Sequence, residues 1–259
     1  MPNMPVTNVK GKKIRLVDYT WDELDSLPDK KSLIFVQPMG ATEGHGYHLP
    51  LGTDTFQAVP IAEAAAKNLS NVIVMPEIPY GFCLDTMSFC GTVSLRADTF
   101  IGIVSDIVEG LYRHGFGKFV LFNGHGGNKG IADTALRNAL QFLGGPAGQV
   151  PRDFRLYNLF AFENIGPQAL RMMEGKDYGH ACEMETSLML ALDPESVKME
   201  RAVEEYMDGD GASFIWRIRD MKEASVSGIH GAANKGTAAK GKELFRIMTE
   251  DLENFLRRI

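Results

Sequence analysis

The amino-acid sequence predicts an α/β fold, a doubly wound and mostly parallel sheet covered by helices on both faces. Short apolar runs recur along the chain and are separated by stretches with helical spacing of apolar residues, which is the alternation expected of strand–helix–strand units. The apolar runs are continuous rather than alternating with polar residues. Both faces of each strand should therefore be buried, as they are in parallel sheets flanked by helices.

Two strands and a helix are predicted in the first third of the chain. Leu33–Val36 is an apolar run that leads into a loop, and Val72–Met75 is a second one. Between them, the Ala-rich segment 54–69 predicts a helix, which Pro60 should kink because proline cannot donate to the helix ladder. Residues 76–95 carry glycines, prolines and polar side chains and predict a long loop. Loops of that length in compact domains are usually functional.

The middle of the chain predicts a helix, a strand and a second helix. Residues 98–114 place apolar side chains on one helical face, and Asp98 is expected to cap the start. Lys118–Phe122 predicts a third buried strand, which runs into the polar segment Asn123–Asn128. A further helix is expected to end near Phe142.

The last part of the chain predicts a turn-rich break at 144–151, a strand at 154–160 and helices at 181–192 and 237–259. No internal repeat or low-complexity linker interrupts the sequence, so one domain covering residues 1–259 is expected. Ligands of such folds bind beyond the carboxyl ends of the strands. The loops after Val36 and Phe122 occupy that position, and both contain histidine.

Composition and charge argue against several classes of function. The net charge is −6 and no Lys/Arg run is present, which argues against nucleic-acid binding. No apolar run approaches the ~18 residues needed to cross a bilayer, and the N-terminus lacks the apolar core of a signal peptide. A cytoplasmic protein without a membrane partner is therefore expected. The three cysteines lack Cys-x-x-Cys spacing, so reduced, partly buried thiols are expected rather than disulfides.

The first candidate site is a cluster of four side chains, Glu43, His45, His48 and Asp54, which lie within twelve residues directly after the first predicted strand. Carboxylate oxygens and imidazole nitrogens together suit zinc, manganese or iron. Glycines within the segment let the backbone turn tightly enough for these side chains to converge. The simpler interpretation is a polar loop in which Thr53 or Asp54 caps the next helix.

The second candidate site is Asn123–Asn128, where a strand meets a helix. Gly126 and Gly127 follow His125, and N–H groups at a helix start favour an anion or oxyanion. The segment is not a phosphate loop, because the Gly-Lys-Ser/Thr ending is absent. The simpler interpretation is a plain strand-to-helix turn.

The third candidate site is His180, Glu183 and Glu185, at the start of a predicted helix. His180 and Glu183 would share one face of that helix, and Glu185 would point elsewhere. The simpler interpretation is that acidic groups in a first helical turn favour the helix dipole. The three clusters together hold four of the six histidines, which favours one shared site. The remaining two are His114, at a helix end, and His230, in a Gly-rich loop.

In order and spacing these clusters resemble the creatininase (creatinine amidohydrolase) family. Residues 43–54 match the pattern Glu-x-His-Gly-x-His-Leu-Pro-x-x-x-Asp, and Asn-Gly-His and His…Glu-Thr-Ser segments follow in order. The likeness covers about Pro38 to Ser187, and the segment Thr237–Gly241 also resembles the family's ending. It implies a doubly wound α/β fold with a binuclear metal centre, in a homo-oligomer that the resemblance makes a hexamer.

By this resemblance, two divalent ions (zinc, manganese or iron) would be held by Glu43, His45, Asp54, His125 and Glu185. Asp54 would bridge the two ions. Such a pair can hold a hydroxide for attack on the carbonyl of a small-molecule substrate. The residues themselves leave open whether Glu183 or Glu185 is the ligand.

The resemblance also implies roles in catalysis. His180 would act as an acid/base that protonates the leaving group, which suits an imidazole near neutral pH. Glu183 would orient His180 or support the metal ligands. The expected substrate contacts, with the two glycine N–H groups as oxyanion donors, are His48, Gly126, Gly127 and Tyr178.

Two departures from the family's pattern bear on the substrate. Gly44 stands where members often have Gln, between the Glu and the His of the first motif. Creatininase proper carries tryptophans in the loops that close over its flat substrate, whereas this chain has only Trp21 and Trp216. The aromatic side chains available to line a pocket instead are Tyr157, Phe160, Phe162 and Tyr178.

Three functions therefore remain open. The first is hydrolysis of a small cyclic or formyl amide. The second is hydrolytic C–C ring opening of a cyclic keto-polyol such as 3-dehydro-scyllo-inosose, which suits a polar pocket without tryptophan. The third is a non-catalytic metal-binding or regulatory protein. Release of ammonia or formate separates the first from the second, and metal analysis tests the third.

Overall fold

The central element is a four-stranded parallel sheet. The computed structural model describes residues 6–144, 151–163, 167–207 and 219–259. The strands are β1 (Ile34–Met39), β2 (Val72–Val74), β3 (Lys118–Asn123) and β4 (Arg155–Phe160), in the order β2-β1-β3-β4. Every neighbouring pair is parallel, so the predicted sheet is confirmed.

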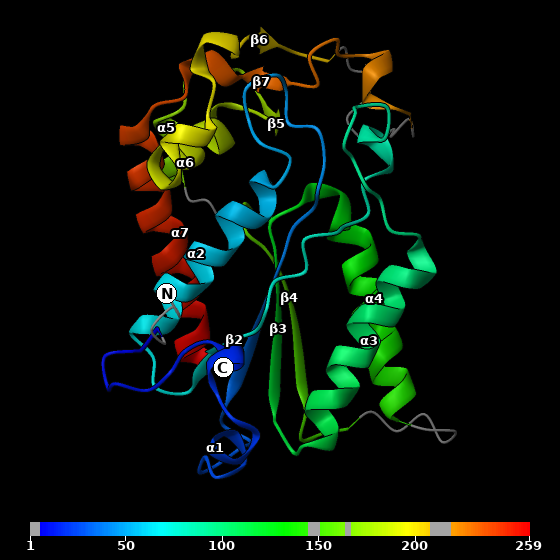
Figure 1. The fold of residues 1–259 in the computed structure, drawn as a ribbon, viewed down its shortest axis with the longest axis vertical. Coiled ribbons are helices and arrows are strands. Elements are labelled where there is room, and N and C mark those ends of the chain that lie inside the picture. Colours follow the sequence, from blue (N-terminus) through cyan, green and yellow to red (C-terminus); the bar gives the residue numbers. More distant parts are fainter. Residues whose placement is uncertain (1–5, 145–150, 164–166, 208–218) are drawn as a thin grey trace.

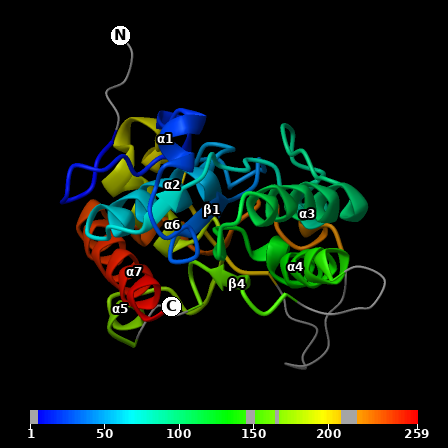
Figure 2. The ribbon, with the colours of Figure 1, turned by 90° about the horizontal axis from the view of Figure 1, so that it is seen from below.

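Helices cover both faces of this sheet, as Figures 1 and 2 show. On one face, α2 (Thr53–Lys67) and α7 (Ala238–Arg258) pack against side chains such as Val36 and Val120. On the other face, α3 (Ala97–Arg113) and α4 (Lys129–Leu143) pack against Phe35, Phe119 and their neighbours. Consecutive strand residues thus point into two different apolar cores, which explains the continuous apolar runs and confirms the doubly wound arrangement.

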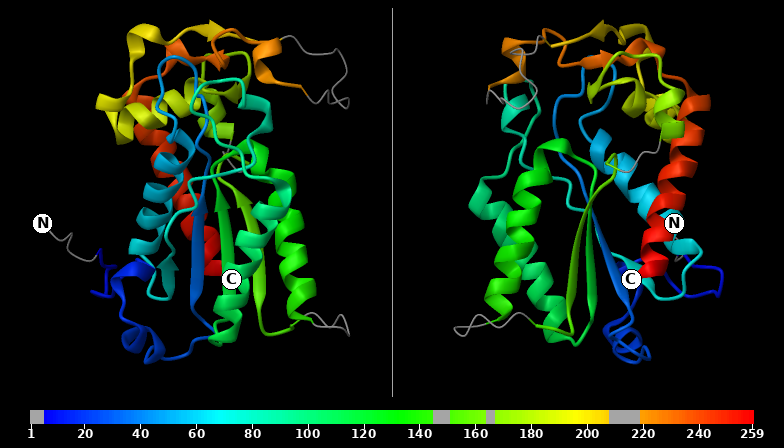
Figure 3. Two further views of the ribbon diagram at one scale, coloured as in Figure 1. Left: turned by 45° about the vertical axis from the view of Figure 1, so that its right-hand side comes forward. Right: turned by 180° about the vertical axis from the view of Figure 1, so that it is seen from behind.

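A small antiparallel sheet lies beyond the carboxyl ends of the main strands (Figures 1 and 3). It has the order β5-β7-β6, from β5 (Tyr178–His180), β6 (Glu204–Glu205) and β7 (His230–Ala232). The sequence did not predict it, because strands of two or three residues that contain Gly, His and Glu show no apolar periodicity. The helix α6 (Glu183–Leu192) follows β5 and packs against α7 and α2.

Most predicted boundaries lie within a few residues of the observed ones, but one cap was wrong. The N-cap of α3 is Arg96, and Asp98 lies in the first turn instead. Residues 76–95 form the expected loop, with a single short turn of 3-10 helix at Leu84–Thr86. Two short helices, α1 (Trp21–Asp25) and α5 (Pro167–Arg171), were not predicted. The predicted break at 144–151 lies mostly outside the described residues.

The parallel register brings the two histidine-containing loops together. Met39 at the end of β1 pairs with Asn123 at the end of β3, so the segments that follow leave the sheet side by side. No helix among the described residues is both long and apolar enough to cross a membrane.

Candidate metal centre

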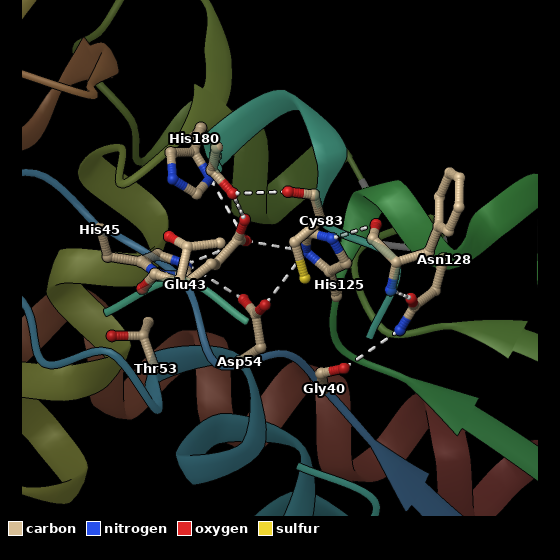
Figure 4. A network of polar contacts seen from close by, with 12 residues as sticks. Gly40, Glu43, His45, Thr53, Asp54, Cys83, His125, Asn128 and His180 are labelled. Atoms are coloured by element: carbon tan, nitrogen blue, oxygen red, sulfur yellow. Dashed lines mark hydrogen bonds and ion pairs between the residues drawn. The ribbon is translucent and has the colours of Figure 1, made fainter. Parts of the chain in front are cut away.

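The side chains predicted as ligands converge at the carboxyl end of the sheet (Figure 4). They come from four places: the loop after β1, the first turn of α2, the segment after β3 and the first turn of α6. All of them are buried, and they are Glu43, His45, Asp54, His125 and Glu185. Each follows a strand or opens a helix, so a rigid element holds it in place.

Asp54 lies at the centre of the cluster. Its Oδ1 is 3.1 Å from Nε2 of His45, and its Oδ2 is 3.1 Å from Nδ1 of His125. The two oxygens of one carboxylate thus face two different imidazoles. Burial alone would raise the pKa of the Asp54 carboxyl, but the two histidines lower it below its usual value. Asp54 thus connects the two histidines of the cluster through one carboxylate.

The two carboxylate oxygens of Glu43 have different partners, a threonine hydroxyl and the histidines of the cluster. Its Oε2 accepts a hydrogen bond of 2.5 Å from the Thr86 hydroxyl. Its Oε1 lies 2.8 Å from Nδ1 of His125 and 3.8 Å from both Nε2 of His45 and Nδ1 of His180. Burial opposes the charged carboxylate, but these histidines hold the pKa of Glu43 well below its usual value.

Backbone carbonyls orient the imidazole rings. The carbonyl oxygen of Glu43 lies 3.2 Å from Nδ1 of His45, and that of Phe82 lies 3.2 Å from Nε2 of His125. A ring N–H that donates to a carbonyl leaves the opposite nitrogen to face the carboxylates, which is how proteins orient metal-binding histidines. Burial disfavours the charged rings, but the facing carboxylates raise the pKa of both histidines well above the usual value.

The chemistry of the cluster fits divalent cations. Oε1 of Glu43 and Oδ2 of Asp54 are fully buried, and both face the same nitrogen, Nδ1 of His125, with no other partner of that kind among the described residues. Buried polar atoms that are incompletely paired are costly, so a cation here would stabilise both oxygens. The described residues contain three groups of possible ligands, and within each group the donor atoms lie within 4.8 Å of one another. They are Glu43 with His45 and His180, Glu43 with Cys83 and His125, and His45 with Asp54 and Glu185. Imidazole and carboxylate ligands of this kind suit zinc, manganese or iron.

The structure separates Glu183 from Glu185. The Glu185 carboxylate faces His45, with Oε1 3.8 Å from Nε2. The Glu183 carboxylate accepts hydrogen bonds from the backbone N–H groups of Glu174 and Gly175 and an ion pair of 2.6 Å from Lys240. Because residues two apart on a helix point in different directions, only one of them can enter the cluster. Among the described residues, Glu185 is the carboxylate that faces the cluster. Glu183 is held by Lys240 and the backbone N–H groups of Glu174 and Gly175, and does not take the expected place beside His180.

His180 lies at the edge of the cluster and is more open than His45 and His125. Its side chain is 13% exposed, its ring centroid is 4.4 Å from that of His45, and the Gly44 carbonyl oxygen lies 2.7 Å from its Nε2. The next residue, Ala181, is buried and has a φ of +49°. A non-glycine residue in the left-handed region is uncommon and is often found at functional sites, and here it links β5 to α6.

The residues predicted to contact the substrate do not all lie in the cluster of predicted metal ligands. His48 is buried, and its Nε2 lies 2.8 Å from the Thr186 hydroxyl; burial lowers the pKa of its imidazole to about 4, so the ring is neutral. Tyr178 is half-buried and packs against the core next to α7. Gly126 and Gly127 lie beside His125 at the start of the helical segment that continues into α4. The substrate contacts of these residues stay a prediction.

Close packing explains the departure at Gly44. A Cβ placed on Gly44 would lie 2.6 Å from Cβ of Phe89. The space that a longer side chain would need is therefore filled from the loop after β2, and that loop also contributes Thr86 and Cys83.

Sequence reasoning missed three residues of the site. Thr86 holds Glu43, as described above. Asn128 donates to the Gly40 carbonyl and accepts from the N–H of Phe82, so it ties three loops together. Cys83 brings its thiol next to Glu43 and His125. For Thr86 and Cys83 the available signal was the long loop 76–95, but its residue types match no spacing rule for ligands. Asn128 stands at the end of the candidate segment Asn123–Asn128, where its side chain was given no role.

Changing Gly127 to alanine should displace His125 and remove part of the bound metal. A Cβ there would lie 2.4 Å from Nε2 of His125 and 2.5 Å from the Phe82 carbonyl oxygen, so the ring and its acceptor cannot both keep their places. Metal analysis of the purified variant should show a lower metal content, with unchanged circular dichroism. Gly126→Ala is the matched control, because its Cβ meets nothing within 4 Å. Wild-type metal content in Gly127→Ala would contradict this account of His125.

Sequence comparison finds similarity to creatininase-family proteins. The family model described as creatininase, creatinine amidohydrolase, matches residues 17–256. Creatinine amidohydrolase of Pseudomonas putida is 32% identical, over 95% of this chain and 97% of that protein. The 3-dehydro-scyllo-inosose hydrolase of Thermotoga maritima is 31% identical, over 89% of this chain and 78% of that protein.

Solved structures agree with these sequence matches. The structure titled "Creatininase Mn" superimposes with a TM-score of 0.85 at 26% identity, over 95% of this chain and 98% of that one. A mutant creatininase described as Zn-Zn type has the same TM-score at 25% identity and the same coverage. The fold described above is thus similar to that of proteins whose titles name manganese or zinc.

Proposed function

The chain belongs to the creatininase family and is a metal-dependent hydrolase, and we propose that it hydrolyses a small cyclic or formyl amide at a centre of two divalent ions. The observation that carries the proposal is the buried cluster of two histidines and three carboxylates, in which Oε1 of Glu43 and Oδ2 of Asp54 share one imidazole nitrogen, Nδ1 of His125, as their partner. Without a metal ion, three buried carboxylates would share only two imidazoles as charged partners, and buried charges are stable only when they are well paired.

The chain would hold the ions at two overlapping positions. Asp54 would be the shared ligand, because its two oxygens face different histidines. Glu43 and His125 would complete one position, and His45 and Glu185 would complete the other. A pair of divalent ions supplies an activated water at neutral pH and polarises the carbonyl under attack.

The residues at the edge of the cluster carry out the proton transfer. When the C–N bond of an amide breaks, the leaving nitrogen needs a proton, and His180 is the partly exposed imidazole next to the cluster. Its bond to the Gly44 carbonyl fixes the ring plane. The N–H groups of Gly126 and Gly127, at a helix start where such groups lack intrahelical acceptors, are proposed as donors to the developing oxyanion.

We assign Glu183 a positioning role. Two backbone N–H groups and Lys240 satisfy its buried carboxylate. These bonds tie the start of α6 to the segment before β5 and to α7. They therefore hold Glu185 and His180, which flank this point in the chain, in their places around the cluster.

One observation favours a second substrate class. Trp21 is 81% exposed and lies in α1, at the end of the molecule opposite the cluster (Figure 1); Trp216 lies outside the described residues. Among the described residues no tryptophan is therefore available to stack on a flat heterocycle. A cyclic keto-polyol is the second candidate, and the 31% identity to the Thermotoga inosose hydrolase supports it.

A product assay decides between the two. The metal-reconstituted protein is incubated with creatinine, a formyl amide and 3-dehydro-scyllo-inosose, with zinc or manganese, and with chelator as the control. The expected result, abolished by chelator, is the ring-opened carboxylate from creatinine, or formate and a free amine from the formyl amide. Acid formation from the ketone alone would move the assignment to C–C hydrolysis. Absence of turnover in a fully metal-loaded protein on all three would count against both.

We also propose that the chain acts as a single domain, in the cytoplasm, and as a homo-oligomer, with the hexamer as the expected form. One feature that supports assembly is β4, the edge strand of the main sheet, whose residues are only partly buried. A groove of about 880 Å³ separates this strand from the C-terminal half of α7, and strand edges left open invite pairing or cover.

A further inference from the structure

We propose that Cys83 is a metal ligand, through its thiolate, at the position held by Glu43 and His125. The sulfur makes this position selective for zinc over manganese, whereas the position held by His45 and Glu185 is not selective in this way. The inference rests on the metal centre proposed above and assigns different chemistry to its two halves.

The sulfur lies within reach of a shared ion. Sγ of Cys83, a carboxylate oxygen of Glu43 and a ring nitrogen of His125 all lie within 4.8 Å of one another. Ligand atoms bound to zinc at ~2.0–2.3 Å in a tetrahedron lie within this span of one another. Figure 4 shows the sulfur directed into the space between His125 and Asp54.

A second feature, independent of the sulfur, also points to a cation at this position. Oε1 of Glu43 is completely buried, makes no regular hydrogen bond among the described residues and lies 2.8 Å from Nδ1 of His125. Cys83 itself is 2% exposed, so its thiol faces the cluster and not solvent. The other two cysteines differ, because Cys90 is exposed and Cys182 packs in the core beside α7.

Hydrogen bonds hold the backbone of Cys83 in place beside the proposed ligand Glu43. Its N–H donates to the Ser94 hydroxyl at 2.9 Å, and its carbonyl accepts from the N–H of Thr86 at 3.3 Å. Thr86 in turn donates to Glu43. Glu43 and Cys83 are therefore linked through one threonine, which keeps the thiol and the carboxylate in fixed relation to each other.

The two positions would then prefer different metals. A thiolate is a soft ligand that favours zinc, whereas carboxylates and imidazole alone also accept manganese and iron. On binding, the thiol gives its proton to solvent, the sulfur–metal bond forms, and no electrons are exchanged. Mixed loading, with zinc at the sulfur-containing position and manganese at the other, is the expected state when both metals are supplied.

Cobalt(II) substitution tests this directly without measuring activity. Cobalt bound by oxygen and nitrogen gives visible d–d bands, and cobalt bound by thiolate adds an intense charge-transfer band in the near ultraviolet. The cobalt-loaded wild-type protein is expected to show both. The charge-transfer band should disappear in Cys83→Ser and persist in Cys90→Ser and Cys182→Ala.

The outcomes separate the two proposals. Visible bands without the near-ultraviolet band in the wild type, or a band that persists in Cys83→Ser, would overturn the role of Cys83 and leave the metal centre standing. Failure of the wild type to bind cobalt, zinc or manganese at all would overturn the metal centre itself.

Zinc titration gives a second readout. Loss of a group that supports a metal ligand typically lowers metal affinity ~10–100-fold. Cys83→Ser removes a ligand itself, so zinc affinity should fall by at least this factor at one of the two positions. Manganese affinity should stay unchanged. An equal loss for both metals would mean that the substitution disturbs the site without removing a soft ligand.

Discussion

Asp54→Ala is expected to lose bound metal from both positions and to abolish hydrolysis. The two oxygens of Asp54 face His45 and His125 at 3.1 Å each, so one truncation removes a ligand from each ion. Two neighbouring cations without a bridging carboxylate also repel each other at short range in a buried site. Metal analysis by mass spectrometry and an assay of turnover measure the two effects together.

A matched control is available in the same kind of position. Asp54 and Asp98 are both acidic residues in the first turn of a helix, α2 and α3, but the Asp98 side chain is exposed. Asp98→Ala therefore removes a similar interaction with a helix dipole and should keep metal and activity. Full activity of Asp54→Ala in metal-depleted buffer would contradict the proposed metal centre.

His180→Ala is expected to keep the metals and lose rate. The ring nitrogen of His180 is 3.8 Å from Glu43, whereas that of His125 is 2.8 Å from the same oxygen. His180 is also the more open of these side chains, which suits contact with a substrate. Loss of a general acid typically lowers kcat by ~10²–10⁴-fold, and KM should change much less.

Metal content tells whether His180 has been assigned correctly. His180 also belongs to a possible donor group with Glu43 and His45, so a fall in bound metal would reassign it as a ligand. His114→Ala serves as the control, because His114 is exposed at the end of α3. A variant that keeps both metals and the full rate would remove His180 from the mechanism.

Much of the site could be predicted because its parts are local in sequence. Glu43, His45 and Asp54 lie within twelve residues, and a strand followed by a tight loop brings such residues together in many arrangements of the rest of the chain. His125 was predictable from the register of parallel strands, because Met39 and Asn123 end at the same edge. The short antiparallel sheet around His180 was not predictable, since its strands have no apolar pattern.

The choice between Glu183 and Glu185 shows where local reasoning stops. Both lie in the first turn of α6, and both suit a helix start. Only the packing of α6 against α7 and the segment at Glu174 decides which carboxylate turns toward His45. That decision depends on residues more than fifty positions away in the sequence.

By itself, the sequence determined the alternation of strands and helices, the two-sided core and the residue types of a metal site, because these depend on periodicity and on chemistry within short segments. Tertiary structure alone decided that Glu185 faces the cluster, that Phe89 fills the space beside Gly44, and that Cys83 enters the site. The physical reason is common to all three. The direction of a side chain relative to a distant loop is set by packing across the fold, and no pattern along the chain records it.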